Sequence, residues 1–506
     1  MAAIAELTRP EKQMDDARMT PASEASQNDT RAALPAKIRG YTDRQSVAPG
    51  EKIHFFISDL QGSDSKYLPI RIIRLGQCEA EVASGVAAVH ASPVPATRGW
   101  ENNGWPVSYT ANVQREWRSG VYVARVSAGT GDSPDIYFVV RRSRRELIVP
   151  IVVQLPTTTI NAYNNWGGAS LYEYNSRPSP AKAVSFNRPQ QSDALWPRGY
   201  GFAEEWSLRI RAFVEWLEAV GYEANYVTNN DMHEDSSLLE SCRLFISIGH
   251  DEYWSREMRR HFDLFIESGG NAAILGGNTC YWQIRLDPDE QTGDAHRLEI
   301  CCRGIHDKQE TGVIHDALGA KNPQGSGGHR SGCGLCGSGP ATVTWRDAGH
   351  PENMSLGAGF ASGAWRGVDR DAGTFTVFRP DHWAFSGTGL RRGDRFGAAD
   401  NERILYYETS GVDYTLDNCG NPVPTGADGT PSTYFILALA DLPFWATPGN
   451  AALGIYTHPR SGGMVFNAAT TDWAKGLEIC ISSGDVFRTV TAKITRNVIE
   501  RLSARL

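Results

Sequence analysis

The stretch Leu244-Phe245-Ile246-Ser247-Ile248-Gly249-His250-Asp251-Glu252-Tyr253-Trp254 places a short apolar run directly before a cluster of ionisable and aromatic residues. Such a run is typical of a strand that is buried on both faces of a sheet. A helix is expected over residues 255–267, since Gly269-Gly270 follows where a helix commonly ends. The stretch therefore predicts one strand–helix unit, with polar side chains at the carboxyl end of the strand.

The same alternation extends to both sides of this stretch. A second helix is expected over residues 204–220, ending at Gly221, and a closing amphipathic helix over residues 485–506. Further buried strands are expected at 147–153, 224–227 and 272–275. This pattern predicts a mostly parallel sheet flanked by helices over residues 146–506, an α/β/α domain of the glutamine-amidotransferase-like or flavodoxin-like kind.

The preceding residues, 38–145, have a different character. Their apolar segments are short, rich in β-branched and aromatic residues, and separated by turn signals such as Pro49-Gly50 and Ser119-Gly120. About seven strands at this spacing predict an immunoglobulin-like β-sandwich. The basic run Arg141, Arg142, Arg144 and Arg145 is interpreted as a solvated linker rather than an anion site. Residues 1–37 have no apolar core of a secretory signal and are expected to be a disordered leader.

Composition excludes several classes of function. The chain has 506 residues, 41% of them hydrophobic, and a formal net charge of −8. A nucleic-acid-binding protein would need a basic surface, and a membrane protein would need a long apolar span, and neither is present in the sequence. Nine cysteines without a disulfide spacing predict reduced thiols and a cytoplasmic location.

A segment rich in glycine and cysteine interrupts the second domain at residues 285–355, where an insertion is expected. Cys333 and Cys336, with Cys301-Cys302 and His329, have part of the spacing of a zinc site. Only one well-spaced pair is present, so free thiols in this insertion are the favoured interpretation, and a zinc site remains the alternative.

Three segments that follow predicted strands carry most of the candidate chemistry, because ligands bind at the carboxyl ends of strands in open α/β sheets. They are residues 161–172, 249–254 and 276–282. Each side chain also has a structural explanation: Tyr163 and Tyr172 as core tyrosines, and His250 as a structural histidine. Glu252 and Asp251 could likewise favour the start of the next helix. Their clustering at several strand ends favours a functional site.

The common hydrolase motifs are missing from the sequence. There is no Gly-x-Ser-x-Gly turn and no His-Glu-x-x-His pattern, and Gly249-His250-Asp251-Glu252 stands where a glutamine amidotransferase would carry its cysteine. The remaining carboxylate, phenols and imidazole suit a hard, oxygen-preferring metal.

Residues 162–168 (AYNNWGG), 249–254 (GHDEYW) and 276–278 (GGN) resemble the signature of the N,N-dimethylformamidase β-subunit-like family, with similarity from Gly40 to Leu506. The resemblance implies a mononuclear Fe(III) site held by two tyrosines and one glutamate. Tyr163 and Glu252 match two of the ligands, and His250 matches the histidine beside the metal. Tyr122 is the best match for the second tyrosine, with Tyr172 and Tyr174 as alternatives. Glu408 is a candidate second catalytic carboxylate.

The function implied by the resemblance is hydrolysis of the C–N bond of a small, N-alkylated, formamide-type amide by metal-activated water. A separate small subunit and a homo-oligomer are the implied partners, with no nucleic acid or membrane. Two alternatives remain: a hydrolase of larger amides, and a non-catalytic module that binds carbohydrate or protein on a degenerate α/β scaffold.

Overall fold

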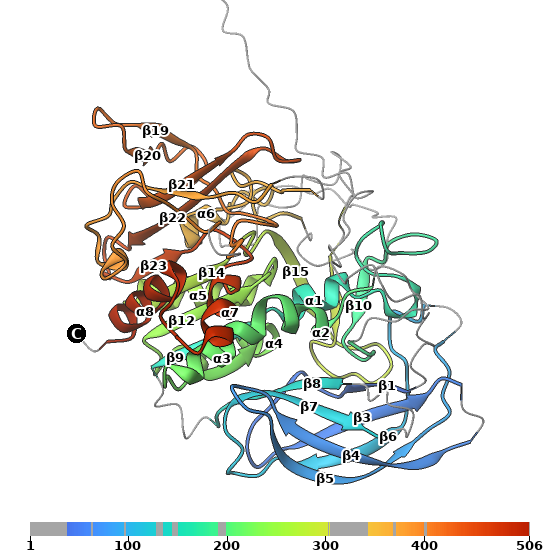
Figure 1. Cartoon of the computed structure of the whole chain (residues 1–506). Helices are drawn as coiled ribbons and strands as arrows, with labels where there is room; N and C mark the ends of the chain where they lie inside the picture. Colours follow the sequence, from blue (N-terminus) through green and yellow to red (C-terminus); the bar gives the residue numbers. More distant parts are fainter. Residues whose placement is uncertain are drawn as a thin grey trace, which may run out of the picture.

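The computed structural model describes residues 38–61, 64–95, 98–127, 135–143, 150–190, 199–301, 303, 343–367, 371–398 and 402–504. The expected leader, Arg144 and Arg145, and Cys333, Cys336 and His329 lie outside the described residues. Within the described ranges no helix is both long and apolar enough to cross a membrane. A small all-β unit packs against one side of a larger mixed body (Figure 1).

The all-β unit consists of two sheets. One contains β1 (Ile38–Thr42), β3 (Lys52–Asp59) and β6 (Val107–Asn112). The other contains β2 (Ser46–Val47), β8 (Asp135–Val140), β7 (Gly120–Val126), β4 (Lys66–Arg74) and β5 (Ala80–Val89), in that order. Ile53 and Phe55 of the first sheet share one buried core with Ile72 and Val126 of the second. Two sheets around a common core agree with the sandwich that the sequence predicts.

The larger body is built on a nine-stranded sheet. Its order is β11 (Asn225–Thr228), β9 (Ile151–Leu155), β12 (Leu244–Gly249), β14 (Asn271–Gly276), β23 (Met464–Asn467), β22 (Gly449–Thr457), β21 (Phe435–Leu442), β17 (Phe375–Val377) and β18 (Arg395–Phe396). The first five strands pair in parallel. The pairs from β23 onward are antiparallel. Half of the sheet is therefore parallel and half antiparallel.

The prediction of a mostly parallel, flavodoxin-like or glutamine-amidotransferase-like α/β/α domain is wrong. Strand–helix alternation holds from β9 to β14, but β21, β22 and β23 then follow one another through short connections, and short connections join antiparallel strands. Smaller sheets add to the β content. They consist of β10 (Ala183–Ser185), β16 (Leu298–Ile300), β15 (Trp282–Asp287) and β13 (Tyr253–Ser255), and of β19 (Tyr414–Leu416) with β20 (Pro422–Pro424).

The helices expected from the sequence are present, with one modification. The helix expected over 204–220 is divided into α2 (Phe202–Glu205), a π-helical turn η4 (Trp206–Ile210) and α3 (Arg211–Ala219). The helix expected over 255–267 is α5 (Arg256–Glu267), and the closing helix is α8 (Val490–Ser503). The remaining helices are α1 (Thr157–Tyr163), η3 (Trp166–Gly168), α4 (Asn229–Glu234), η5 (Ser236–Leu239), α6 (Asn353–Leu356), η7 (Trp383–Phe385) and α7 (Lys475–Ser483).

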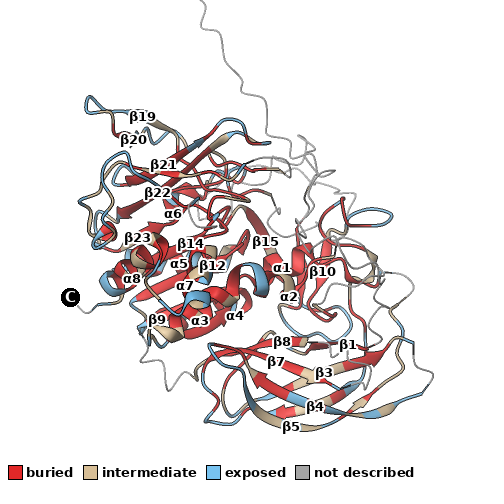
Figure 2. Ribbon diagram, viewed as in Figure 1, coloured by how far each residue is buried: buried red, intermediate tan, exposed pale blue. Residues whose placement is uncertain are grey.

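Polar contacts join the sandwich to the larger body. Arg141 Nε lies 3.1 Å from Asp231 Oδ1, and Arg142 donates to Glu223 at 3.0 Å. These two linker arginines therefore pair with carboxylates of the larger body. The strands of the central sheet are buried along almost their whole length, whereas exposed residues gather in the outer loops and on the outer strands of the sandwich (Figure 2). A rigid, buried parallel half-sheet thus supports the strand ends at which the candidate residues lie.

Candidate active site

Three strand ends converge because β9, β12 and β14 are parallel neighbours. β9 leads into α1, which ends at Tyr163, while β12 ends at Gly249, directly before His250 and Glu252. Asn278 follows β14 with a φ of +50°, a left-handed conformation that asparagine tolerates better than most residues. The structure therefore brings these three segments to one edge of the sheet.

Glu252 is the centre of the cluster. Its Oε2 atom accepts a hydrogen bond from the Tyr163 hydroxyl at 3.0 Å and another from the Tyr172 hydroxyl at 3.0 Å. The two phenol rings lie 4.1 Å apart between centroids, and Tyr253 donates to the Tyr172 hydroxyl at 2.8 Å. All four side chains are buried. Two phenols therefore converge on one oxygen of a single carboxylate.

A second carboxylate lies near the same ring nitrogen of His250. His250 Nε2 is 2.9 Å from Glu408 Oε2 and 3.4 Å from Glu252 Oε2. Asn278 Nδ2 donates to Glu408 Oε2 at 2.9 Å. One imidazole nitrogen thus lies close to two buried glutamates. The structure brings together five of the residues singled out from the sequence: Tyr163, Tyr172, His250, Glu252 and Glu408.

Burial dominates the electrostatics of the cluster. Desolvation raises the pKa of Tyr163 and of Tyr172 well above the ordinary value, and it raises the pKa of Glu252. For His250, burial disfavours the charged imidazolium, but Glu408 and Glu252 outweigh that effect and leave its pKa raised. At neutral pH the protein alone therefore holds both phenols protonated, in agreement with their role as donors to Glu252.

Tyr122, the residue that best matched the second tyrosine, lies elsewhere. Its ring is stacked on Trp117 at 5.5 Å in the core of the sandwich, and its hydroxyl donates to the Arg118 carbonyl at 2.6 Å. Its hydroxyl therefore donates within the sandwich and not to the cluster around Glu252. The structure places Tyr172, the alternative, beside Glu252, while Tyr174 packs against Tyr172 with its ring centroid 5.8 Å away.

Asp251 points away from the cluster and has a structural role. It accepts hydrogen bonds from Gln154 at 2.6 Å, Ser247 at 2.8 Å and Asn229 at 2.9 Å. It does not cap α5, because the Ser255 side chain accepts the bond from the helix N-terminus. Asp251 therefore links β12 to β9 below the turn that carries His250 and Glu252.

Two contacts of the cluster were not predicted. Arg303 lies with its guanidinium carbon 3.5 Å from the centroid of the Tyr172 ring and 4.9 Å from that of Trp282. Its charge lowers the pKa of Tyr172, against the larger effect of burial. No sequence pattern predicted this stacking, because Arg303 stands in the irregular segment 285–355. Tyr253 belongs to the GHDEYW motif, and its position beside His250 and Glu252 in that motif could have indicated that it lies near the cluster.

The loop that carries both tyrosines is fixed by a buried arginine. Arg188 donates from Nη1 to the Trp166 carbonyl at 2.9 Å and from Nη2 to the Asn161 carbonyl at 2.9 Å. Its Nε donates to the Ser185 carbonyl at 3.0 Å. Burial lowers its pKa to about 9, so the guanidinium stays charged at neutral pH. One side chain thus holds the backbone on both sides of Tyr163.

Several oxygen atoms of the cluster have unused capacity. Among the described residues, Glu252 Oε1, Glu408 Oε1 and Asn278 Oδ1 are buried and accept no hydrogen bond. Buried polar atoms are normally satisfied, so these oxygens suit a ligand, a water or a cation. In the described part of the chain, no three His, Cys, Asp or Glu side chains lie close enough together to hold a metal ion by themselves. A cation here would need the phenol oxygens as well.

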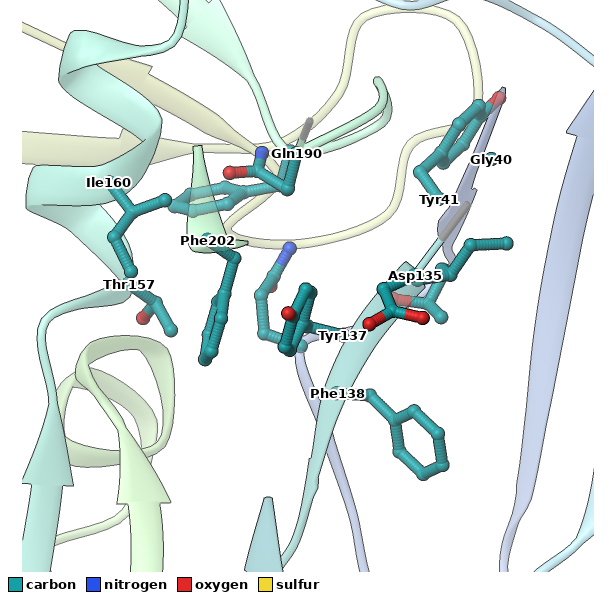
Figure 3. Close-up of a pocket in the computed structure, with 13 residues that line it drawn as sticks. Gly40, Tyr41, Asp135, Tyr137, Phe138, Thr157, Ile160, Gln190 and Phe202 are labelled. Atoms are coloured by element: carbon teal, nitrogen blue, oxygen red, sulfur yellow. The ribbon is translucent and has the colours of Figure 1, made fainter. Parts of the chain in front are cut away.

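A separate pocket lies between the sandwich and α1 (Figure 3). Its walls include Tyr41 and Tyr137 from the sandwich and Thr157, Ile160 and Phe202 from the larger body. Its volume of about 20 Å³ accommodates a water molecule but no organic substrate. None of the clustered residues around Glu252 lines it, so this pocket is a packing gap at the junction.

Comparison with solved structures gives only low similarity. Spo0M, a sporulation control protein from Bacillus subtilis, is 10% identical over 23% of this chain and 54% of its own, with a TM-score of 0.16. A β-glucosidase from Erythrobacter marinus is 6% identical over 21% of this chain and 15% of its own, with a TM-score of 0.14. A Paenibacillus cycloisomaltooligosaccharide glucanotransferase is 11% identical over 43% and 27%, with a TM-score of 0.16. The chain spans about half the length of the first of these proteins.

Comparison with protein families gives a clear result. No curated protein sequence matches the chain. The model of the family described as N,N-dimethylformamidase beta subunit-like, C-terminal, matches residues 73–486, which include Tyr163, Tyr172, His250, Glu252 and Glu408. This match covers most of the chain and all of the cluster. The protein is a member of the N,N-dimethylformamidase β-subunit-like family.

Proposed function

We propose that the protein hydrolyses the C–N bond of a small, N-alkylated, formamide-type amide at the cluster around Glu252. The observation that carries this proposal is the convergence of the Tyr163 and Tyr172 hydroxyls on Glu252 Oε2, at 3.0 Å each, with His250 and Glu408 alongside. In a module that only binds a partner, two buried glutamates beside an imidazole would have no evident role, and burying charged groups costs free energy of folding. Membership of the family supports amide hydrolysis.

The residues fit a mononuclear Fe(III) ion, with Tyr163, Tyr172 and Glu252 as the proposed ligands. Two phenolates and one carboxylate supply three negative charges and only oxygen donors, which a hard trivalent ion prefers. The unused Glu252 Oε1 supports this assignment. When bound, such an ion would polarise the amide carbonyl and make water a better nucleophile at neutral pH.

His250 and Glu408 are proposed to move the proton. Hydrolysis forms a C–O bond from water, breaks the C–N bond and transfers one proton from water to the leaving amine. Imidazole is suited to accept and release that proton. Glu408, 2.9 Å from His250 Nε2, stabilises the imidazolium while it carries the proton, and Asn278 keeps the carboxylate in place at 2.9 Å.

The surroundings favour a small substrate. The cluster is packed among aromatic side chains, including Tyr281, Phe360, Trp365 and Tyr407. Aromatic walls suit the methyl groups of an N-alkylated amide and leave little room for a larger acyl chain. A separate small subunit, a homo-oligomeric assembly and a cytoplasmic location belong to the same proposal. The family description, which names a β subunit, supports a further subunit.

Metal analysis with visible spectroscopy and an amide assay tests the proposal. The purified protein is expected to contain close to one iron per chain and to show a phenolate-to-iron absorption band. It is also expected to release dimethylamine from N,N-dimethylformamide. Iron-free, colourless protein that neither takes up iron nor releases amine after ferric loading would refute the proposal.

Glu408→Gln is expected to reduce kcat by roughly 10²–10⁴-fold, the usual contribution of a proton-transfer group. Glutamine keeps the shape of the side chain but cannot neutralise the imidazolium of His250. Iron content is expected to remain at the wild-type level, because Glu408 is not among the proposed ligands. Steady-state kinetics with iron analysis of the same samples measures both quantities. A variant with wild-type kcat would remove Glu408 from the mechanism.

A further inference from the structure

A second set of buried polar groups lies behind His250. Glu205 Oε1 accepts the His250 backbone N–H at 3.0 Å, and Glu205 Oε2 accepts from Arg209 Nη1 at 2.8 Å. The Tyr200 hydroxyl also donates to Glu205 Oε2. Arg209 Nε lies 3.4 Å from Asp472 Oδ1. All of these side chains are buried, and none takes part in the proposed mechanism.

The local backbone is adapted to this arrangement. Glu205 ends α2, and Arg209 lies in the π-helical turn η4 that follows. A π-helical turn is a rare feature that is frequent at functional sites. The turn leaves Arg209 beside both Glu205 and Asp472, so that the arginine is shared between two carboxylates from distant segments of the chain.

The turn that carries His250 is shaped around Glu205. Gly249 has a φ of +71°, and a Cβ atom at this position would lie 2.5 Å from Glu205 Oε1. On the neighbouring strand, a Cβ atom at Gly276 would lie 2.5 Å from the Gly249 carbonyl oxygen. The peptide that leads into His250 is therefore held closely from two sides, with the Glu205 carboxylate on one of them.

The same network touches other parts of the cluster. The Tyr200 ring lies 5.8 Å from the Tyr163 ring, and the Arg209 guanidinium lies 5.2 Å from the centroid of Tyr407, the residue before Glu408. The ring of Tyr407 lies 5.7 Å from that of His250. Each partner of Glu205 thus packs against a residue in or beside the cluster.

We propose that Glu205 is a positioning residue, which anchors the backbone of His250 and thereby aims its imidazole at Glu408. Tyr200 and Arg209 hold the carboxylate of Glu205 in place for this task. The effect of Glu205 on turnover rests on the proposed function, whereas its effect on the position of the His250 imidazole does not. Displacement of a reacting group by about 1 Å can reduce turnover by roughly 10²-fold, so an anchor of this kind has a measurable effect.

Two substitutions separate the anchor from the ion pair. Glu205→Ala removes the acceptor for the His250 N–H and the partner of Arg209. Glu205→Gln keeps an oxygen that accepts the His250 N–H but loses the charge that faces Arg209. We expect Glu205→Ala to lower kcat by roughly 10²-fold with KM within about twofold. We expect Glu205→Gln to recover most of kcat while its unfolding midpoint stays below that of the wild type.

Asp231→Ala provides a matched control for Glu205→Ala. Asp231 is also buried, accepts one backbone N–H from Thr228 at 2.8 Å and pairs with one arginine, Arg141, at 3.1 Å. It lies at the junction with the sandwich, where it also accepts a hydrogen bond from Ser46. Its substitution is expected to shift the unfolding midpoint as Glu205→Ala does, with kcat unchanged. Equal losses of kcat in both variants would reduce Glu205 to a structural residue and overturn the inference.

A crystal structure of Glu205→Ala gives a result that does not depend on activity. We expect the His250 imidazole to leave its position 2.9 Å from Glu408 Oε2, while Tyr163 and Tyr172 remain on Glu252. An unchanged contact between His250 and Glu408 would overturn the inference, even if the wild-type protein hydrolyses amides. Conversely, a displaced His250 in a protein without amidase activity would support the anchor and refute only the proposed function.

Discussion

Tyr172→Phe is expected to abolish iron binding and amide turnover together, with a loss of at least roughly 10³-fold in activity, equal to about 4 kcal/mol of barrier. The physical reason is that phenylalanine has no oxygen to give to the metal, and that the Tyr172 hydroxyl is one of two phenol groups that donate to Glu252 among the described residues. Iron content, the visible absorption band and the amide assay measure the effect on one preparation.

Tyr122→Phe is the control for this prediction. Its hydroxyl donates to the Arg118 carbonyl within the sandwich, so its loss is expected to cost about 1 kcal/mol of stability and to leave iron content and kcat intact. The opposite pattern, with iron lost in Tyr122→Phe and retained in Tyr172→Phe, would show that the ligand set is wrong. Unfolding by urea separates the small loss of stability from any loss of metal.

Arg188→Met is expected to reduce the free energy of unfolding by about 3 kcal/mol or more. Methionine fills much of the space but leaves the carbonyls of Asn161, Trp166 and Ser185 buried without their donor, and each such group costs about 1–3 kcal/mol. The loop around Tyr163 loses its anchor in the same step, so iron affinity is expected to fall as well. Denaturant titration and iron titration measure the two effects.

Arg125→Met provides the comparison for Arg188. Arg125 pairs with Glu79 and Asp135 at 2.7 Å each in the sandwich, where Glu79 is exposed and the other two side chains are partly exposed, so that solvent screens the charges. Its substitution is expected to cost less than about 1 kcal/mol, because surface ion pairs contribute little. If Arg188→Met cost no more than Arg125→Met, the buried carbonyls of the Tyr163 loop would not depend on the arginine.

Part of the site could be predicted because it follows from local pattern. His250 and Glu252 come directly after the apolar run 244–248, and Tyr163 comes shortly after the run that ends near Leu155. The carboxyl ends of neighbouring parallel strands meet at one edge, so such residues must lie close together. The resemblance to the family added Glu408, which no nearby strand pattern would have placed there.

The mixed sheet could not be predicted from strand–helix alternation. β21 and β22 are apolar along most of their length, and such a run fits a parallel or an antiparallel strand equally well. Their direction depends on the connections between them and on which strand edge remains open beside β14 and β23. These are properties of the assembled sheet, and the alternation from β9 to β14 does not continue to the end of the chain.

The sequence by itself determined the strand–helix units from β9 to β14, the sandwich before them, and the position of His250, Glu252 and Tyr163 after buried strands, because hydrophobic periodicity and strand ends are local properties. Only the tertiary structure places Tyr172, and not Tyr122, beside Glu252. Both are buried tyrosines in apolar surroundings, and the difference between them is which acceptor the hydroxyl reaches: the Arg118 carbonyl or the Glu252 carboxylate. The contact of Tyr172 with Glu252 joins residues 80 positions apart. The stacking of Arg303 on Tyr172 and the hydrogen bond from the His250 N–H to Glu205 also join residues that are distant in the sequence.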